Sequence, residues 1–275
     1  MKWLVRVLFG LVALGALVYV GILITLYVKQ RDFQYAAAGE ITALDRTLLS
    51  AAQAVNIPTG ENATLAGWYA PPREGMPTIL YYKGNTGSFT GEHERYEAFV
   101  EAGYGFLAFD YRGFPATPGT LSQDRILEDA LSAFDWLAQR QNRILIWGRS
   151  LGTGPATYVA SRRDADAVLL ETPFLSALAV AAERYWYLPV SWLMFDQFPS
   201  NQWIAEVTEP VFVAHGTADQ TINVSHGERL YALVPNPYAL WIEPGAGHGD
   251  LWARGIWGRA ETFFREVEAK LTASR

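Results

Sequence analysis

The chain has 275 residues and a formal net charge of -6, and its 22 Lys and Arg are scattered without a basic run. Nucleic-acid-binding proteins normally carry a basic patch, so we exclude nucleic acid as a partner. The absence of cysteine excludes disulfides, thiolate nucleophiles and Cys-based metal sites. Half of the residues are hydrophobic, and the length suffices for one α/β domain plus an appended segment.

An uncharged, apolar stretch occupies residues 7–28. As a helix it would be about 33 Å long, enough to cross a hydrocarbon core of about 30 Å. A cleaved signal peptide is the alternative, because 36–38 are all Ala, but the apolar core of a signal peptide has only about 7–15 residues. We therefore expect an uncleaved, single-pass membrane anchor within residues 1–30 and a polar linker at 31–50.

Positive charges flank this stretch on both sides. Lys2 and Arg6 precede it, and Lys29 and Arg31 follow it. Cytoplasmic flanks carry the excess of Lys and Arg, and the amino terminus adds one more charge to the first group. The positive charge is therefore slightly greater before the stretch than after it. This difference favours a cytoplasmic N-terminus, which places the rest of the chain outside the cytoplasm.

After the linker, short apolar runs alternate with amphipathic stretches, a pattern that predicts a sheet covered by helices. Apolar residues at helical spacing are clearest at 122–140 and 251–271. The alternation breaks at about 173–205, which we interpret as an inserted segment. The predicted strands lie at 52–57, 65–70, 78–82, 106–110, 144–147, 167–171, 211–215 and 239–243.

Residues 146–154 read IWGRSLGTG and place Gly148-x-Ser150-x-Gly152 between a predicted strand and a helical pattern. In a nucleophile elbow, this tight turn presents the serine at the carboxyl edge of the sheet. The serine adopts a strained backbone, and glycines admit the close approach of strand and helix. Glycines at this spacing also occur in nucleotide-binding loops of reductases, but such loops normally follow the first strand of a domain. Ser150 is therefore the predicted nucleophile, and a reductase is the weaker alternative.

A serine hydroxyl reacts only when an imidazole takes its proton and a carboxylate orients that imidazole. Asp219 and His248 each follow a predicted strand, so we expect both at the sheet edge that carries Ser150. We predict that these three residues form a catalytic triad. Glu171, at the end of another strand, is a weaker alternative acid.

The other histidines and Asp250 have structural interpretations. Asp250 is expected to cap the helix at 251–271. His215 lies in a strand and should be buried, whereas His93 and His226 fall on helical patterns and should face solvent. No paired spacing of metal ligands occurs, so we expect neither a metal nor another cofactor.

Acyl transfer also needs backbone N–H donors that stabilise the oxyanion of the tetrahedral intermediate. Leu151, directly after the predicted nucleophile, should supply one. The second should come from the loop after strand 78–82, which reads KGNTGS, and we predict the N–H of Asn85.

The segments LYYKGNTGS, FDYRGF, GRSLGTG, LLETPF, HGTADQTINVSHGERLY and PGAGHGDLW together resemble one group of α/β-hydrolases. This group comprises membrane-anchored serine hydrolases whose animal relatives include depalmitoylating protein thioesterases. The resemblance covers about residues 50–271. It implies a mostly parallel sheet of about eight strands with helices on both faces and a short cap. The hydrolase domain would then occupy 51–275, with the cap at about 173–205, behind one N-terminal transmembrane helix.

The resemblance also assigns roles to individual residues. It makes Ser150 the nucleophile, Asp219 the acid and His248 the base, with Asn85 and Leu151 as oxyanion donors. Two segments depart from the family pattern. Lys83-Gly84-Asn85 stands where the family usually has His-Gly-Asn, and residues 114–117 replace a usual Gly-x-Gly-x-Ser run.

We therefore expect a serine hydrolase that cleaves carboxylic ester or thioester bonds through an acyl-enzyme. The aromatic residues of the inserted segment predict an apolar acyl pocket or a contact with the membrane surface, and hence a small-molecule or lipid-like acyl substrate. Two alternatives stay open: a catalytically silent, membrane-anchored binding protein of the same fold, and a serine peptidase.

Overall fold

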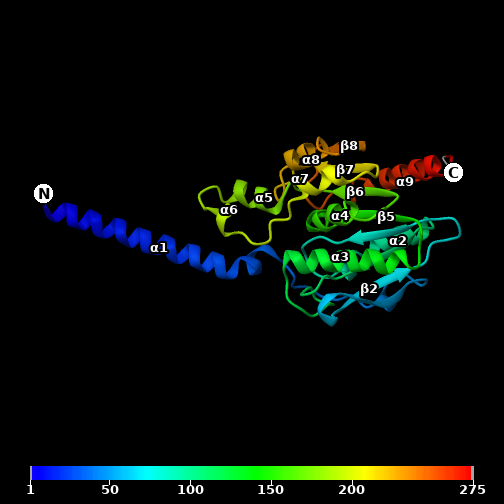
Figure 1. Cartoon of the computed structure of the whole chain (residues 1–275), viewed down its shortest axis with the longest axis horizontal. Coiled ribbons are helices and arrows are strands. Elements are labelled where there is room, and N and C mark those ends of the chain that lie inside the picture. Colours follow the sequence, from blue (N-terminus) through cyan, green and yellow to red (C-terminus); the bar gives the residue numbers. More distant parts are fainter. Residues whose placement is uncertain (1, 274–275) are drawn as a thin grey trace.

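The body of the protein is built on one eight-stranded sheet (Figure 1). The structure is a computed structural model and describes residues 2–273. All eight predicted strands are present, and none of their ends is shifted by more than two residues. In their order across the sheet, the strands are β1 (Gln53–Pro58), β2 (Thr64–Ala70), β4 (Gly105–Phe109), β3 (Thr78–Tyr82), β5 (Ile144–Arg149), β6 (Ala167–Glu171), β7 (Val211–Gly216) and β8 (Pro237–Glu243).

Strand direction decides where the site can form. β2 runs antiparallel to both of its neighbours, and every other neighbouring pair is parallel. β3, β5, β6, β7 and β8 therefore all end at one edge of the sheet, where Tyr82 pairs with Gly148 and Gly216 pairs with Glu243. Ligands of open α/β sheets bind at such an edge. The predicted fold class is confirmed.

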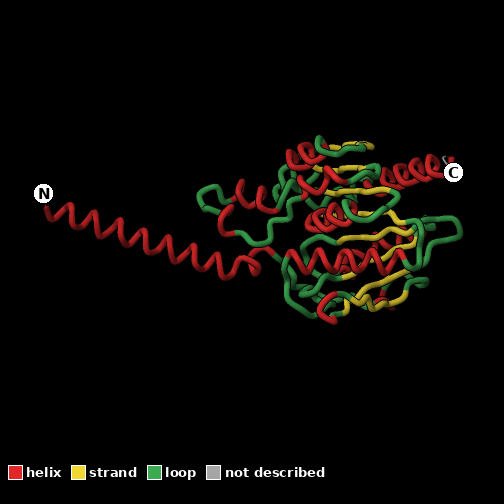
Figure 2. Tube along the Cα trace, in the orientation of Figure 1, coloured by secondary structure: helices red, strands yellow, loops and turns green. Residues whose placement is uncertain are grey.

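Helices cover both faces of the sheet (Figure 2). Strand side chains alternate between the faces, so Leu80 and Tyr82 join one apolar core while Ile79 and Tyr81 join the other. Residues from α3 (Gln123–Ala138), α4 (Thr153–Ala160) and α8 (Val224–Tyr231) complete the first core, and residues from α2 (His93–Glu101) and α9 (Ile256–Ala273) complete the second.

The last helix starts later than its sequence pattern predicts. α9 begins at Ile256, after a run of turns, so the prediction of a helix from 251 capped by Asp250 is wrong. Gly255 has φ of 90°, in the left-handed region, which separates the preceding turns from the helix. The Asp250 carboxylate instead accepts the Gly247 N–H at 2.7 Å.

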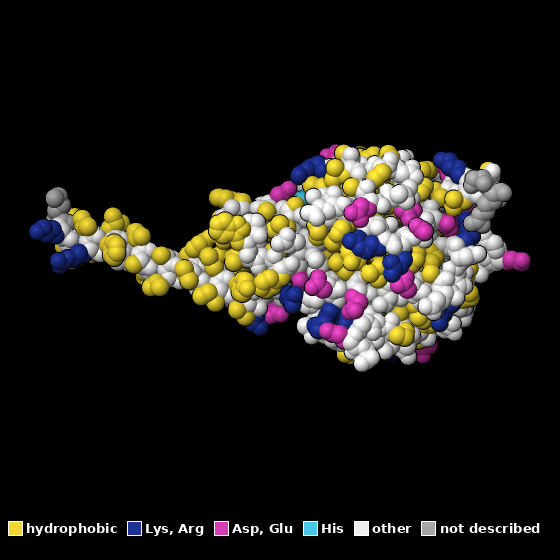
Figure 3. Space-filling view, in the orientation of Figure 1, with side chains coloured by type: hydrophobic (Ala, Val, Ile, Leu, Met, Phe, Trp, Pro, Cys, Tyr) yellow, Lys and Arg dark blue, Asp and Glu magenta, His cyan; other side chains and the backbone are white. Residues whose placement is uncertain are grey.

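Helix α1 (Lys2–Gln34) projects from the body as a single long helix (Figure 1) and extends past residue 30, where the sequence predicts the anchor to end. Its surface is apolar along most of its length (Figure 3), and its most hydropathic window has no buried residue. Within residues 2–273 it alone is long and apolar enough to cross a membrane, judged by length and composition.

The inserted segment (residues 173–205) lies between α1 and the sheet (Figure 1) and contains α5 (Ala177–Arg184), α6 (Val190–Leu193) and α7 (Ser200–Trp203). Its aromatic side chains fall into two groups. Phe174 and Phe198 are buried in the first core, whereas Trp186 and Trp192 are 81% and 88% exposed. The segment therefore packs on the body and also presents an aromatic surface.

Candidate active site

Ser150 occupies a strained turn between β5 and α4. Its φ is 51°, a left-handed value that a non-glycine residue adopts only when its surroundings enforce it. A 3₁₀ turn over Ser150–Gly152 follows β5 directly and leads into α4. This is the backbone conformation that the sequence pattern predicts for a nucleophile elbow.

The two flanking glycines are required by close backbone contacts. A Cβ on Gly152 would lie 2.0 Å from the carbonyl oxygen of Tyr82, at the end of β3. A Cβ on Gly148 would lie 2.6 Å from the carbonyl oxygen of Gly152. Both distances are far below van der Waals contact, so no side chain fits at either position.

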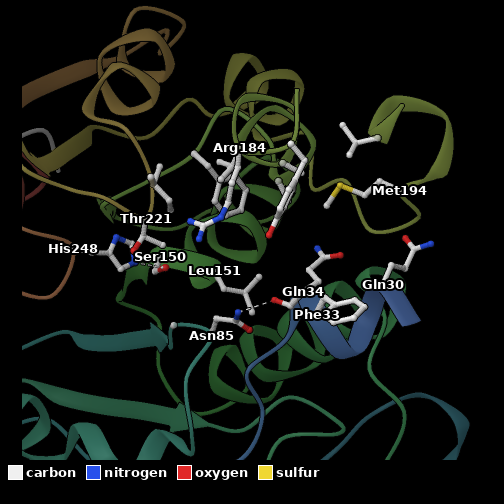
Figure 4. A pocket seen from close by; sticks show the side chains of 18 of the residues that line it. Gln30, Phe33, Gln34, Asn85, Ser150, Leu151, Arg184, Met194, Thr221 and His248 are labelled. Carbon is white, nitrogen blue, oxygen red and sulfur yellow. Dashed lines mark hydrogen bonds between the residues drawn. The ribbon is translucent and has the colours of Figure 1, made fainter. Parts of the chain in front are cut away.

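The structure brings Ser150, His248 and Asp219 together (Figure 4). The Ser150 Oγ lies 2.8 Å from the His248 Nε2, and the His248 Nδ1 lies 2.7 Å from the Asp219 Oδ2. When Nδ1–H donates to the carboxylate, Nε2 has a free lone pair for the serine proton. The arrangement can deprotonate the hydroxyl and stabilise the imidazolium that results.

Asp219 is held as a carboxylate by donors on several sides. Its Oδ1 accepts the N–H groups of Thr221 and Ile222 at 2.8 and 2.9 Å, and the His215 Nε2 lies 3.3 Å from its Oδ2. Burial alone would raise the pKa of Asp219, but hydrogen bonds from His215, His248 and Ile222 outweigh it and hold the pKa well below its usual value. The residue that orients His248 therefore stays ionised at neutral pH.

The predicted oxyanion donors border the same cavity as Ser150 and His248. The N–H of Leu151 lies in the first turn of its helix, where backbone N–H groups have no intrahelical acceptor. Asn85 follows β3, and its side chain is occupied away from the serine: Nδ2 donates to the Gln34 carbonyl at 2.8 Å, and Oδ1 accepts the Ala36 N–H at 3.2 Å (Figure 4). The backbone role of both residues stays a prediction.

Sequence comparison places the chain among curated relatives, although no protein-family model matches it. It is 34% identical over 246 residues to uncharacterized protein Rv2307c of Mycobacterium tuberculosis, with 87% of each chain covered. It is 32% identical over 198 residues to lysophosphatidylserine lipase ABHD12 of Danio rerio, which covers 64% of this chain and 52% of that protein.

Solved structures agree on the fold. The esterase Pf2001 of Pyrococcus furiosus superposes with a TM-score of 0.63 at 23% identity, over 86% of this chain and 97% of that one. The acetyl xylan esterase of Paenibacillus sp. R4 gives 0.63 at 19% identity, over 88% and 91%. The chain belongs to the α/β-hydrolase-domain family.

In this α/β-hydrolase, the two segments that depart from the family pattern are in contact. The Lys83 ammonium is fully buried, donates to the Gly84 carbonyl at 2.8 Å and lies 3.8 Å from the centre of the Phe114 ring. The Asp110 Oδ1 is 4.0 Å away. Lys83 therefore supports the loop that carries Asn85, and the sequence alone did not reveal that Phe114 covers it.

Glu171 and His215 have structural roles. The Glu171 carboxylate accepts two hydrogen bonds from Arg95, at 2.8 and 2.9 Å, and one from the Trp147 indole, whereas the carboxylate bonded to His248 is that of Asp219. His215 is buried, as predicted, and its Nε2 donates to a backbone carbonyl.

The prediction of a solvent-facing His226 is wrong. This side chain is fully buried, because its face of α8 packs against the inserted segment. Its Nε2 lies 3.0 Å from the Glu183 carboxylate, and its Nδ1 accepts the Leu175 N–H. His93, also predicted to face solvent, is partly buried and bonds to Glu97.

A cavity of about 800 Å³ opens onto Ser150 and His248, within the size range of small-molecule sites. Most lining residues are apolar, and the charged ones are Arg149 and Arg184; the described lining contains no Asp or Glu. Arg149 faces two carboxylates, those of Glu92 at 3.4 Å and Glu171 at 3.7 Å. This charge pattern favours a neutral or anionic substrate. Within residues 2–273, no cluster of His, Asp and Glu could hold a metal ion.

We predict that Gly152→Ala lowers the free energy of unfolding by more than about 3 kcal/mol, because the added methyl group clashes with the backbone at Tyr82. Thermal unfolding of the detergent-purified protein measures this. Gly91→Ala is the control, since a Cβ there meets nothing within 4 Å. Equal melting temperatures for the two variants would contradict the steric argument.

A second prediction concerns pH. Burial lowers the pKa of Lys83 from 10.5 to about 8 in the folded protein, so the unfolded chain binds more protons between these two values. Stability should then rise with pH from about 8 to 10.5, by at most about 3 kcal/mol, relative to Lys83→Met. Melting temperatures of both proteins across this range measure the difference. Parallel profiles would show that Lys83 does not titrate there.

Proposed function

We propose that this α/β-hydrolase cleaves carboxylic esters or thioesters of acyl substrates through Ser150, His248 and Asp219. The supporting observation is the chain of two short hydrogen bonds from the Ser150 hydroxyl to the Asp219 carboxylate, at the floor of an apolar cavity. The strained backbone at Ser150 supports the same role, because such strain persists where function requires it.

In the proposed reaction, the Ser150 Oγ attacks the acyl carbonyl carbon and its proton passes to the His248 Nε2. Asp219 stabilises the imidazolium, and the N–H groups of Leu151 and Asn85 stabilise the oxyanion. The intermediate collapses to an acyl-serine and expels an alcohol or thiol, which takes the proton back from His248. Water then gives a proton to His248, attacks the acyl-serine and releases the carboxylic acid, and the proton returns to Ser150.

The membrane is part of this proposal. We propose that residues 1–30 anchor the protein through the apolar stretch 7–28, and that 51–275 form the hydrolase domain. Residues 31–50 would link the two, with the end of α1 extending the anchor helix to Gln34. The inserted segment would act as the cap. The side of the membrane on which the site lies stays a prediction of the flanking charges.

The substrate is proposed to be a neutral or anionic acyl compound of lipid-like character. The cavity is mostly apolar and lacks carboxylates among its described residues, and one relative is a lysophosphatidylserine lipase by name. A peptidase is less well supported, because no carboxylate in the described lining could bind a free amino terminus.

We predict that Ser150→Ala lowers kcat for p-nitrophenyl esters by at least about 10³-fold, because the nucleophile is lost while the fold remains. A fluorophosphonate probe should label the wild type and not this variant. Ser161→Ala, at the end of α4, should keep both labelling and activity. An unlabelled wild type would instead support the catalytically silent binding protein.

A chain-length panel tests the acyl pocket. The kcat/KM for p-nitrophenyl esters should rise from acetyl to lauroyl, because the longer chain buries more apolar surface in the cavity, at about 25 cal/mol per Å². Steady-state rates of full-length protein in mixed micelles measure this. Equal values for acetyl and lauroyl esters would contradict an apolar acyl site.

A further inference from the structure

One face of helix α1 lines the cavity that contains Ser150. The lining residues from α1 are Leu26, Gln30, Phe33 and Gln34. Counted from Leu26, the other three lie four, seven and eight positions further along, which places all of them on one face of the helix. The helix that carries the apolar stretch is therefore also a wall of the candidate active site.

This part of α1 is firmly attached to the inserted segment. The Arg31 guanidinium donates two hydrogen bonds to the Asp196 carboxylate, at 2.9 and 3.1 Å, and Tyr35 donates a third. The Gln30 side chain donates to the Leu193 carbonyl and accepts the Phe195 N–H. A bidentate pair to a nearly buried carboxylate holds a fixed geometry.

The inserted segment also extends along the apolar part of α1. The Tyr19 hydroxyl donates to the Tyr187 carbonyl at 3.2 Å, and the Tyr27 and Phe195 rings lie 4.9 Å apart. Tyr19 is about 13 Å along the helix from the end of the stretch 7–28. Apolar side chains continue from α1 onto this segment (Figure 3). Both elements are therefore at the level of the bilayer if α1 spans it.

The two ends of the cavity differ in the residues that line them. Ser150 and His248 lie at one end, while Gln30 and Met194 lie towards the other (Figure 4). Leu26, which also lines the cavity, belongs to the uncharged stretch of α1. The reacting end thus lies near the polar oxyanion loop, and the opposite end lies beside the hydrocarbon-facing part of the helix.

From these contacts we infer that α1 forms one wall of the acyl site, and that the acyl chain of a lipid held in the same bilayer enters between α1 and the inserted segment. The chain lies along Leu26 with its carbonyl carbon at Ser150. This inference rests on the proposed function and names the source of its substrate. It makes Leu26 a specificity-determining residue for acyl-chain length.

The first test compares chain-length selectivity in full-length protein reconstituted in phosphatidylcholine vesicles. Leu26→Trp narrows the cavity, so the ratio of kcat/KM for p-nitrophenyl laurate to that for acetate should fall at least about tenfold. Val28→Trp is the matched control, since Val28 is 70% exposed and two positions away on the helix, on another face. A ratio that falls equally in both variants, or in neither, would overturn the inference.

The second test introduces single cysteines, which can be alkylated selectively because the chain has no native cysteine. Leu26→Cys and Val28→Cys are each alkylated with N-ethylmaleimide, before and after reaction of Ser150 with a methyl or a dodecyl fluorophosphonate. The dodecyl chain should slow alkylation at position 26 by about tenfold, and the methyl group should not; position 28 should be unaffected by either.

The outcomes separate the two proposals. If Ser150 reacts with both fluorophosphonates but the dodecyl chain leaves alkylation at position 26 unchanged, the acyl chain does not lie along α1 and the inference fails. If Ser150 reacts with neither fluorophosphonate, the proposed function fails.

Discussion

At Gly152 the backbone of the elbow approaches the end of β3 so closely that no side chain fits between them. This contact joins the two loops on which the site is built, since Ser150 belongs to one and Asn85 to the other. It lies two residues from Ser150, whose backbone is left-handed and whose hydroxyl lies within hydrogen-bond distance of His248. The remaining elements of the site are arranged around this junction.

Electrostatics then determine how the site can react. Asp219 is surrounded by donors, so its charge persists despite burial and keeps His248 in one orientation. On the other side of the elbow, Lys83 is buried against the Gly84 carbonyl and the Phe114 ring. The two departures from the family pattern, at Lys83 and around Phe114, thus pack against each other. Neither of them alters Ser150, His248 or Asp219, the three residues of the proposed triad.

Helix α1 is connected to the candidate active site by short polar contacts. The Gln34 carbonyl and the Ala36 N–H both bind the Asn85 side chain, so the loop expected to supply an oxyanion donor is positioned by the end of α1. The same helix end is attached to the inserted segment through Asp196. Helix α1, the loop that carries Asn85 and the inserted segment therefore form one connected structure around the cavity.

The sequence by itself determined the strands, the elbow and the order of Ser150, Asp219 and His248, because periodicity, glycine spacing and strand ends are local properties of the chain. The partners of individual side chains were decided only by the tertiary structure. His226 is buried because Glu183 and Leu175, far away in sequence, pack against it. Likewise, α1 lines the cavity because residues far away in sequence, such as Asp196, bind it. Such contacts depend on how distant elements pack, and no short pattern in the sequence encodes that packing.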